Sequence, residues 1–221
     1  MSAINELCGF RHPAPVVLAG PTGSGKTQFL RDILKHHMLQ PPPERIIWIY
    51  DEWQPAYDDL KAVAPNIEFR KLGADCSVES LYESLDPDVR NFVVLDDQMC
   101  KKEVRDSLAL VKLFTQGSHH RNTTVAYIVQ NLFDQGDAMR TASLNSHYLV
   151  LFKNPRDKGQ ARALAQQMYP SNKNFFVRSF ENATSEPFNP LMIDLKQDTP
   201  EELRLRTRVF HPYPIVYLQP N

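Results

Sequence analysis

The chain has 221 residues, of which 42% are hydrophobic and 23% charged, a composition typical of one globular domain with a sizeable core. A formal net charge of −1 excludes a global positive field, so a nucleic-acid partner has to be held by local basic patches or by patches summed over an oligomer. The three cysteines show no paired spacing, and no apolar run approaches the roughly 20 residues that cross a bilayer. We therefore expect a soluble, intracellular protein with no disulfide scaffold and no zinc site.

Short apolar segments alternate along the chain with segments of helical periodicity. This pattern predicts an α/β fold with a mostly parallel sheet and helices on both faces. The segments are rich in Val, Ile, Leu, Phe or Tyr without clean alternation, as expected for strands that are covered on both sides. The predicted strands are 16–20, 45–51, 91–97, 124–131 and 147–153, with a shorter one at 67–72.

Helices are predicted between these strands. Apolar side chains at positions 29, 30, 33, 34 and 38 repeat at helical spacing, and three consecutive prolines at 41–43 end that helix. A second helix is expected over 104–114, ending near Gly117, and a third over Gly159–Met168.

The character of the chain changes from about residue 175. The segments 175–180, 191–195 and 208–210 predict short strands, and 199–202 predicts a helix start with Pro200 in its first turn. We expect residues 1–174 to form the core. Residues 175–221 are expected to be a strand-rich extension packed on or extending the core sheet, in a single domain overall.

The glycine-rich segment between the first strand and the first helix fits the phosphate-loop pattern G-x-x-x-x-G-K-[ST]. Backbone N–H groups of such a loop cradle the β-phosphate at a helix N-terminus, the lysine (Lys26) neutralises β- and γ-phosphate oxygens, and the Thr27 hydroxyl ligates Mg²⁺. ATP and Mg²⁺ are therefore the expected cofactors. A glycine turn that arose by chance is the alternative. The predicted nucleotide-binding residues are Gly20, Pro21, Thr22, Gly23, Ser24, Gly25, Lys26, Thr27 and Gln28.

Two acids end the predicted strand 91–97. If this strand runs parallel to the loop strand, Asp96 lies on the Mg²⁺ side, acting through a coordinated water. Asp97 stands where many ATPases carry a glutamate that polarises the attacking water, although aspartate is shorter by one methylene. Strand-end acids that start a turn are the alternative interpretation.

The predicted strand 124–131 is expected between the loop strand and the acid strand, as in RecA-like sheets. The amide of Gln130 at its carboxyl end would then lie near the γ-phosphate and sense hydrolysis. Arg121 precedes this strand, where it is either an arginine finger supplied to a neighbouring subunit or a solvated cation at a helix end.

Several segments together resemble one family. They are the phosphate loop 20–27, the acid strand 93–97, the run QGSHHRN at 116–122, IVQNLF at 128–133 and SLNSHYLVLFKNPRD at 143–157. This combination resembles the DNA-packaging ATPases of the FtsK–HerA superfamily, in the form found in Polinton-like elements, adintoviruses and related double-stranded DNA viruses. The resemblance runs from the phosphate loop to about Tyr169 and continues more loosely beyond it.

The resemblance implies a P-loop fold of the RecA-like, FtsK–HerA (ASCE) type. It implies a motor that hydrolyses ATP in a ring of identical subunits, a pentamer or hexamer, and translocates double-stranded DNA into a preformed capsid. Capsid or portal-vertex proteins are then partners, a membrane is not, and the protein acts at capsid assembly sites inside the host cell. By match to the family's motifs Arg121 is the candidate trans finger and Gln130 the sensor, with Arg140 and Arg156 as secondary candidates at the subunit boundary.

The DNA-contacting and base-contacting residues are less clearly marked. Two basic clusters either bind DNA or form solvated surface: Lys101, Lys102 and Arg105 after the acid strand, and Arg204, Arg206 and Arg208, whose alternation would place them on one face of an extended segment. Three aromatic residues either stack on adenine or fill a core or interface: Trp53, Tyr57 and Phe133.

Two other functions remain open at this stage. One is a P-loop nucleoside or nucleotide kinase, for which the segment 154–157 would be a short lid. The other is a nucleotide-binding packaging scaffold without productive hydrolysis, against which the combination of Lys26, Thr27, Asp96 and Asp97 argues.

Overall fold

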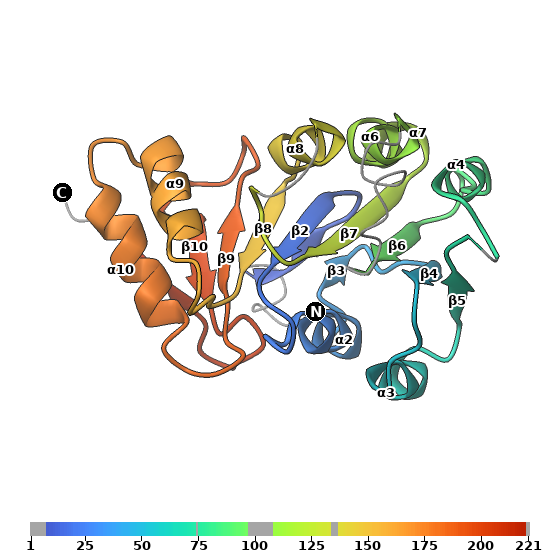
Figure 1. The fold of residues 1–221 in the computed structure, drawn as a ribbon, viewed down its shortest axis with the longest axis horizontal. Coiled ribbons are helices and arrows are strands. Elements are labelled where there is room, and N and C mark those ends of the chain that lie inside the picture. Colours follow the sequence, from blue (N-terminus) through green and yellow to red (C-terminus); the bar gives the residue numbers. More distant parts are fainter. Residues whose placement is uncertain (1–7, 74, 97–107, 134–136, 220–221) are drawn as a thin grey trace.

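The computed structural model describes residues 8–73, 75–96, 108–133 and 137–219. These residues form one large sheet flanked by helices, with a small parallel pair, β1 (Phe10–Arg11) and β3 (Leu39–Gln40), beside it (Figure 1). The strands of the large sheet are β2 (Pro15–Ala19), β4 (Arg45–Tyr50), β5 (Ile67–Lys71), β6 (Asn91–Leu95), β7 (Thr123–Val129), β8 (Tyr148–Leu151), β9 (Leu191–Asp194), β10 (Leu205–Thr207) and β11 (Ile215–Val216).

The order of the large sheet is β11-β10-β9-β8-β2-β7-β6-β4-β5. All pairs from β8 to β5 are parallel, whereas β9, β10 and β11 each pair antiparallel with their neighbours. The mostly parallel α/β sheet predicted from the sequence is therefore confirmed. So is the position of β7 between the loop strand β2 and the acid strand β6.

The helices cover both faces of the sheet (Figure 1). α2 and α3 lie on one face, and α4, α6, α9 and α10 pack on the other. The helices of the described residues are α2 (Lys26–Lys35), α3 (Ala56–Val63), α4 (Val78–Glu83), α6 (Leu108–Thr115), α7 (Gly117–His120), α8 (Asp137–Leu144), α9 (Gly159–Met168) and α10 (Lys173–Ala183), with a 3₁₀ turn at Glu201–Leu203.

The central strand β2 shows why these strands read as continuous apolar runs. Val17 and Ala19 belong to the core on one face, and Val16 and Leu18 to the core on the other. Because successive side chains of a strand point to opposite faces, a strand covered on both sides needs apolar residues at every position.

The segment 175–180 was predicted as a strand, and this prediction is wrong: it lies within α10. Phe176, Ser179 and Ala183 form the buried stripe of that helix, at spacings of three and four residues. The Asn172 side chain caps its start by accepting a hydrogen bond from the N–H of Phe175. The aromatic and β-branched residues of this segment favour a strand in isolation, but in the structure they form an amphipathic helix.

The prediction of a strand at 208–210 is also wrong, because the observed strand, β10, covers Leu205–Thr207. It ends where Arg208 adopts a left-handed backbone conformation with φ 53°. The helix start predicted at 199–202 corresponds to the 3₁₀ turn after Pro200. The boundary proposed at residue 174 falls in the first turn of α10, and the division into core and extension stays a prediction.

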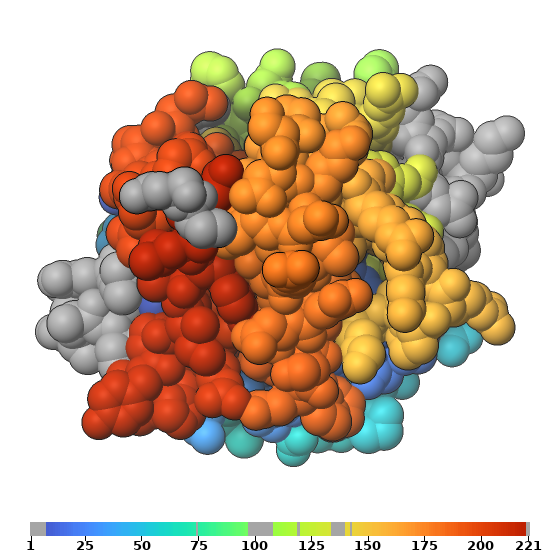
Figure 2. All heavy atoms as spheres, turned by 90° about the vertical axis from the view of Figure 1, so that its left-hand side faces the viewer, coloured from blue at the N-terminus to red at the C-terminus, as the bar shows by residue number. Residues whose placement is uncertain are grey.

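The segment that follows α9 covers one end of the molecule. Figure 2 shows α9, α10 and the later strands side by side over this end. Within the described part of the chain, no helix combines the length and apolarity that crossing a bilayer requires.

Candidate nucleotide site

The strand register brings three sequence-predicted residues to one edge of the sheet. Ala19 pairs with Val129 in β7, and Leu95 of β6 pairs with Tyr127. The residues that follow these strands are Gly20, Asp96 and Gln130, so all three lie at the carboxyl edge, where parallel α/β sheets bind ligands.

Glycine is required at two positions of the phosphate loop. A Cβ on Gly20 would lie 2.6 Å from the Cβ of Phe152 and 2.8 Å from the Oγ of Ser24, so the loop passes here only without a side chain. Gly25 has a φ of 100° and is the N-cap of α2, with no side-chain cap among the described residues. The first turn of α2 therefore offers its backbone N–H groups to an anion.

Lys26 is buried at the base of the loop, with 7% of its surface exposed. Its ammonium donates hydrogen bonds to the carbonyl oxygens of Gly20, at 2.5 Å, and Pro21, at 3.0 Å. These contacts hold the charge beside the N-terminus of α2, which is the position that phosphate neutralisation requires.

A cavity of about 250 Å³ lies in front of the loop. Its lining includes most of the predicted nucleotide-binding residues, together with Asp96 and Gln130 from the ends of β6 and β7. The lining residues are Thr22, Gly23, Ser24, Gly25, Lys26, Thr27, Gln54, Asp96, Ile128 and Gln130. We call it the phosphate cavity.

Gln54 in this lining was not singled out from the sequence. It follows β4, whose carboxyl end reaches the same edge because Ile49 pairs with Leu95. No local motif marks it. Its one sequence signal is that it comes shortly after a buried parallel strand, where ligand-contacting residues are common.

Asp96 is 3% exposed and is held on two sides. Its N–H donates to the carbonyl oxygen of Ile49 at 3.1 Å, and its Oδ2 accepts a hydrogen bond from the hydroxyl of Tyr57 at 2.5 Å. Burial, with the nearby Asp96 charge as a further cause, raises the pKa of Tyr57 far above its ordinary value of 10. The phenol is therefore the proton donor of this pair.

The donor set fits Mg²⁺. Thr27 and Asp96 supply a hydroxyl and a carboxylate to one cavity, and Mg²⁺ prefers oxygen ligands and is commonly held by one or two carboxylates together with substrate phosphates and waters. Among the described residues no group of three or more His, Cys, Asp and Glu side chains forms a metal cage. The loop also carries a buried hydroxyl oxygen, Ser24 Oγ, that has no hydrogen-bond partner within the described structure.

Four predicted residues lie outside the described part of the chain. They are Asp97, Lys101, Lys102 and Arg105. The roles predicted for them stay predictions.

Arg121 lies at the opposite edge of the sheet, before the start of β7. Asn122 and the seven residues of that strand separate it from Gln130, and the strand alone spans about 20 Å. Its guanidinium donates to the carbonyl oxygen of Leu85 at 3.2 Å and lies 5.1 Å from the ring centre of Tyr82. Arg121 therefore does not reach the phosphate cavity of its own chain. It is the C-cap of α7, as the helix-end alternative expected, but its side chain is half-buried by these contacts and not fully solvated.

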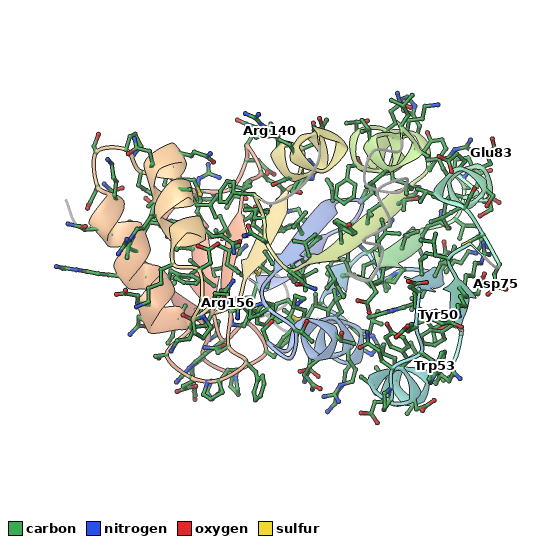
Figure 3. All side chains as sticks on the ribbon, in the orientation of Figure 1. Tyr50, Trp53, Asp75, Glu83, Arg140 and Arg156 are labelled. Atoms are coloured by element: carbon green, nitrogen blue, oxygen red, sulfur yellow. The ribbon has the colours of Figure 1, made fainter. Side chains whose placement is uncertain are left out.

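The two secondary arginines lie apart from each other (Figure 3). Arg140 is exposed on α8 and lines a different cavity with Phe133 and Leu144. Arg156 is exposed in the loop after β8, at the same edge as the phosphate loop. In that loop the Asn154 side chain accepts hydrogen bonds from the N–H groups of Arg156 and Asp157, which makes a tight turn.

The aromatic residues considered for adenine line neither the phosphate cavity nor its neighbour described below. Trp53 and Tyr57 belong to an aromatic cluster beside β4, with ring centres 5.3 Å apart, and Phe133 lies on the far side of the sheet near α8. Figure 3 shows Trp53 beside Tyr50 in this cluster. Tyr57 is fully buried in the core, whereas Trp53 and Phe133 are 43% and 46% exposed. A place in an interface for these two stays a prediction.

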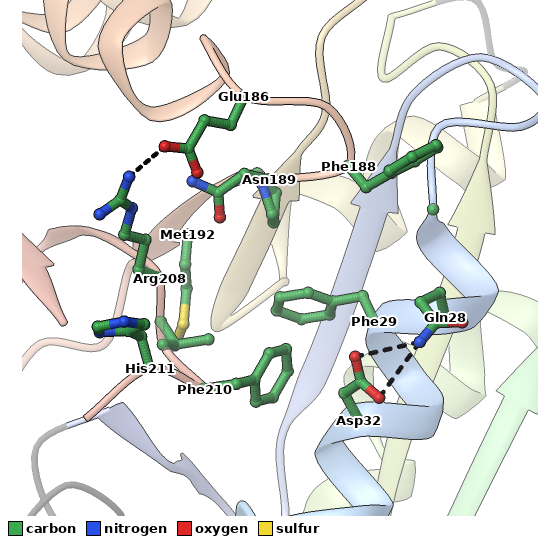
Figure 4. Close-up of a pocket in the computed structure, with 13 residues that line it drawn as sticks. Gln28, Phe29, Asp32, Glu186, Phe188, Asn189, Met192, Arg208, Phe210 and His211 are labelled. Carbon is green, nitrogen blue, oxygen red and sulfur yellow. Dashed lines mark hydrogen bonds and ion pairs between the residues drawn. The ribbon is translucent and has the colours of Figure 1, made fainter. Parts of the chain in front are cut away.

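A second cavity, of about 520 Å³, adjoins the phosphate cavity at Gly25 (Figure 4). Gln28, Phe29 and Asp32 of α2 form one wall, and the opposite wall comes from the segment after α10. The residues of that wall are Glu186, Phe188, Asn189, Pro190, Met192, Arg208, Val209, Phe210 and His211. We call it the aromatic cavity.

Phe188 stands at the junction of the two cavities. It is 67% exposed, has a left-handed backbone with φ 64°, and its Cβ lies 3.2 Å from the position of a Cβ at Gly25. A side chain at position 25 would crowd this contact, and the φ of 100° also favours glycine there, so the phosphate loop and the C-terminal segment pack closely against each other.

The alternating arginines of the C-terminal segment do not share one free face. Arg206 is 3% exposed and donates to the Asp194 carboxylate at 2.7 Å. Arg204 binds Glu201 and two backbone carbonyls, and Arg208 pairs with Glu186 in the aromatic cavity. Of the three, Arg206 alone lies within β10, and it is buried, so they do not form one exposed stripe along this strand. DNA contact by Arg204 or Arg208 stays a prediction.

Known proteins resemble this chain in sequence over a short segment and in fold over most of its length. No family model matches the chain. Packaging protein 1 of snake adenovirus serotype 1 is 38% identical over 72 residues, which cover 33% of this chain and 14% of the viral protein. The chain thus spans only a small part of that relative's length.

Solved structures share the fold. The DNA-packaging ATPase B204 from Sulfolobus turreted icosahedral virus aligns with a TM-score of 0.57 and 12% identity over 84% of this chain and 94% of that one. The genome-packaging NTPase B204 from Sulfolobus turreted icosahedral virus 2, in complex with ATPγS, gives a TM-score of 0.55, 15% identity and the same coverage. A KaiC-like protein from Pyrococcus horikoshii aligns over 99% of this chain and 96% of its own, with a TM-score of 0.52 and 14% identity. The fold is that of a P-loop ATPase, and the resemblance to viral packaging ATPases expected from the sequence is confirmed.

Proposed function

We propose that this protein is a viral genome-packaging ATPase that binds ATP with Mg²⁺ and couples hydrolysis to movement of double-stranded DNA into a capsid. The observation that carries the proposal is the convergence of Lys26, Thr27, Asp96 and Gln130 on one cavity at the carboxyl edge of the sheet. The similarity to an adenovirus packaging protein supplies the biological setting.

Within this proposal each residue has a distinct task. The N–H groups of the loop and Lys26 bind the β- and γ-phosphates, and Thr27 and Asp96 hold the magnesium ion, which neutralises phosphate charge when bound. Gln130 meets the γ-phosphate end of the cavity, where its amide distinguishes the triphosphate from the diphosphate. Asp97 remains the proposed base that orients the attacking water.

The base and ribose of ATP lie in the aromatic cavity. This assignment follows from continuity, because the two cavities meet at Gly25, and from chemistry, because Phe188 and Phe210 offer aromatic surfaces to a flat base. Gln28, Asp32 and Asn189 supply hydrogen-bonding groups at the margins.

DNA-stimulated turnover tests the proposal directly. Purified protein with double-stranded DNA is expected to release inorganic phosphate from ATP, and its particle mass with a non-hydrolysable analogue and DNA is expected to be five or six times that of one chain. A Lys26→Ala variant measured in parallel sets the background. Turnover no faster than that background would favour a packaging scaffold, and phosphate found on a nucleotide acceptor would favour a kinase.

Shared sites between subunits are tested by mixing. We propose that Arg121 acts on the nucleotide of a neighbouring subunit, since it cannot reach its own. Arg121→Ala should retain nucleotide binding but lose hydrolysis by about 10³-fold. Mixing it with an Asp97→Asn variant that keeps Arg121 should then restore part of the turnover. Absence of rescue at every ratio would contradict a trans role and turn attention to Arg156.

A further inference from the structure

One hydrogen bond near the phosphate cavity belongs to a residue that the proposed function does not use. Tyr57 on α3 is 0% exposed, and its hydroxyl lies 2.5 Å from the Oδ2 of Asp96, itself 3% exposed. Tyr57 is not part of the cavity lining, so it touches neither the nucleotide nor the metal.

The ring of Tyr57 is clamped on several sides. Its centre lies 5.3 to 5.8 Å from those of four neighbouring aromatic rings, which leaves the hydroxyl little freedom. The neighbours are Trp48, Tyr50, Trp53 and Phe69. A phenylalanine would fill the same space, so packing alone does not explain the hydroxyl.

The end of β4 and the start of α3 both bind Asp96. At one end the carbonyl of Ile49 accepts the Asp96 N–H, and at the other end Tyr57 binds the Asp96 side chain. Between them Gln54 lines the phosphate cavity, and its carbonyl accepts the N–H of Tyr57 at 3.0 Å. The segment 49–57 therefore holds both the backbone and the side-chain carboxylate of Asp96 in place.

We propose that Tyr57 is a positioning residue of the nucleotide site, whose hydroxyl fixes the orientation of the Asp96 carboxylate toward the magnesium ion that accompanies the nucleotide. This inference rests on the proposed function. A charge-assisted O–H···O⁻ bond of this length is strong, and partners that orient metal-binding carboxylates typically change metal affinity or activity by 10- to 100-fold when removed.

The test compares Tyr57→Phe with Tyr50→Phe, which removes a hydroxyl from the same aromatic cluster. Calorimetry measures the affinity for a non-hydrolysable ATP analogue with Mg²⁺ and with EDTA, and hydrolysis is titrated against Mg²⁺. Tyr57→Phe should leave the metal-free affinity within about twofold, weaken the Mg²⁺-dependent affinity and raise the half-saturating Mg²⁺ concentration by about tenfold or more. Tyr50→Phe should match the unchanged protein in each measurement.

A double-variant cycle separates positioning from packing. If Tyr57 acts through Asp96, Tyr57→Phe adds little in an Asp96→Asn background, whereas a purely structural effect would persist in full. Thermal unfolding without ligands reports any loss of the fold in either background.

The possible outcomes distinguish failure of the positioning role of Tyr57 from failure of the proposed ATPase function. Nucleotide binding by the unchanged protein, combined with the same Mg²⁺ dependence in Tyr57→Phe, overturns the positioning role alone. Failure of the unchanged protein to bind the analogue with or without Mg²⁺ overturns the proposed function and this inference together.

Discussion

The two cavities that meet at Gly25 are built in different ways. The phosphate cavity is lined mainly by one continuous loop, 22–27, with single residues added from strand ends on the same sheet edge. The aromatic cavity joins α2 to a wall more than 150 residues later in the chain. The first presents backbone N–H groups and a buried lysine, and the second presents mostly side chains. Phosphate recognition thus depends on residues close together in the sequence. Recognition of a base depends on the packing of the C-terminal segment against α2.

Between the two cavities, the larger expected effect comes from removing the charge of the phosphate cavity. Lys26→Ala should reduce hydrolysis by roughly 10²- to 10³-fold, because a preorganised donor aimed at developing charge is lost. It should also weaken binding of tripolyphosphate, which has no base. The matched control is Lys35→Ala, at the exposed last turn of the same helix. Equal weakening in both variants would mean that the whole helix, and not the buried ammonium, binds phosphate.

An intermediate effect is expected in the aromatic cavity. Phe188→Ala should raise the KM for ATP about tenfold, the usual loss for one base–aromatic stack, and change kcat little. Affinity for tripolyphosphate, measured by calorimetry, should be unaffected because that probe does not enter this cavity. Phe133→Ala provides a partly exposed phenylalanine elsewhere as a control. Loss of tripolyphosphate affinity in Phe188→Ala would show that the two cavities are not separable.

The smallest expected effect concerns the opposite edge of the sheet, which belongs to neither cavity. There His12 is 8% exposed, and its ring nitrogens bind the Thr124 hydroxyl at 2.8 Å and the Asn122 side chain at 3.1 Å. Burial lowers the pKa of His12 below its ordinary value of 6.5. The unfolded chain therefore takes up the proton first, and the free energy of unfolding should fall as pH decreases below about 6.5.

A His12→Gln variant should lose that part of the pH dependence while nucleotide affinity stays unchanged. Thermal unfolding between pH 7.5 and 5.5 measures it, with the exposed His120→Gln as a control. An unaltered slope in His12→Gln would place the pH dependence in other groups. A change in nucleotide affinity would show that the two edges are coupled.

Much of the fold was predictable because buried parallel strands are apolar at every position, as β2 illustrates. The phosphate loop, Asp96 and Gln130 were predictable for a related reason: each follows such a strand, and parallel strands end at a common edge. The C-terminal segment was harder. Its aromatic residues suit a strand as well as a helix, and only the packing of Phe176 against the sheet decided for α10.

The sequence by itself determined the strands of the parallel sheet and the phosphate cradle. Apolar runs mark strands that are covered on both faces, and the glycines of the loop permit the backbone conformation that the cradle needs. The tertiary structure alone decided that Tyr57 binds Asp96, that Phe188 packs on Gly25 and that Arg206 is buried against Asp194. These contacts join residues whose spacing in the chain carries no periodic signal. Their partners are chosen by how the layers pack, and packing is a property of the whole chain.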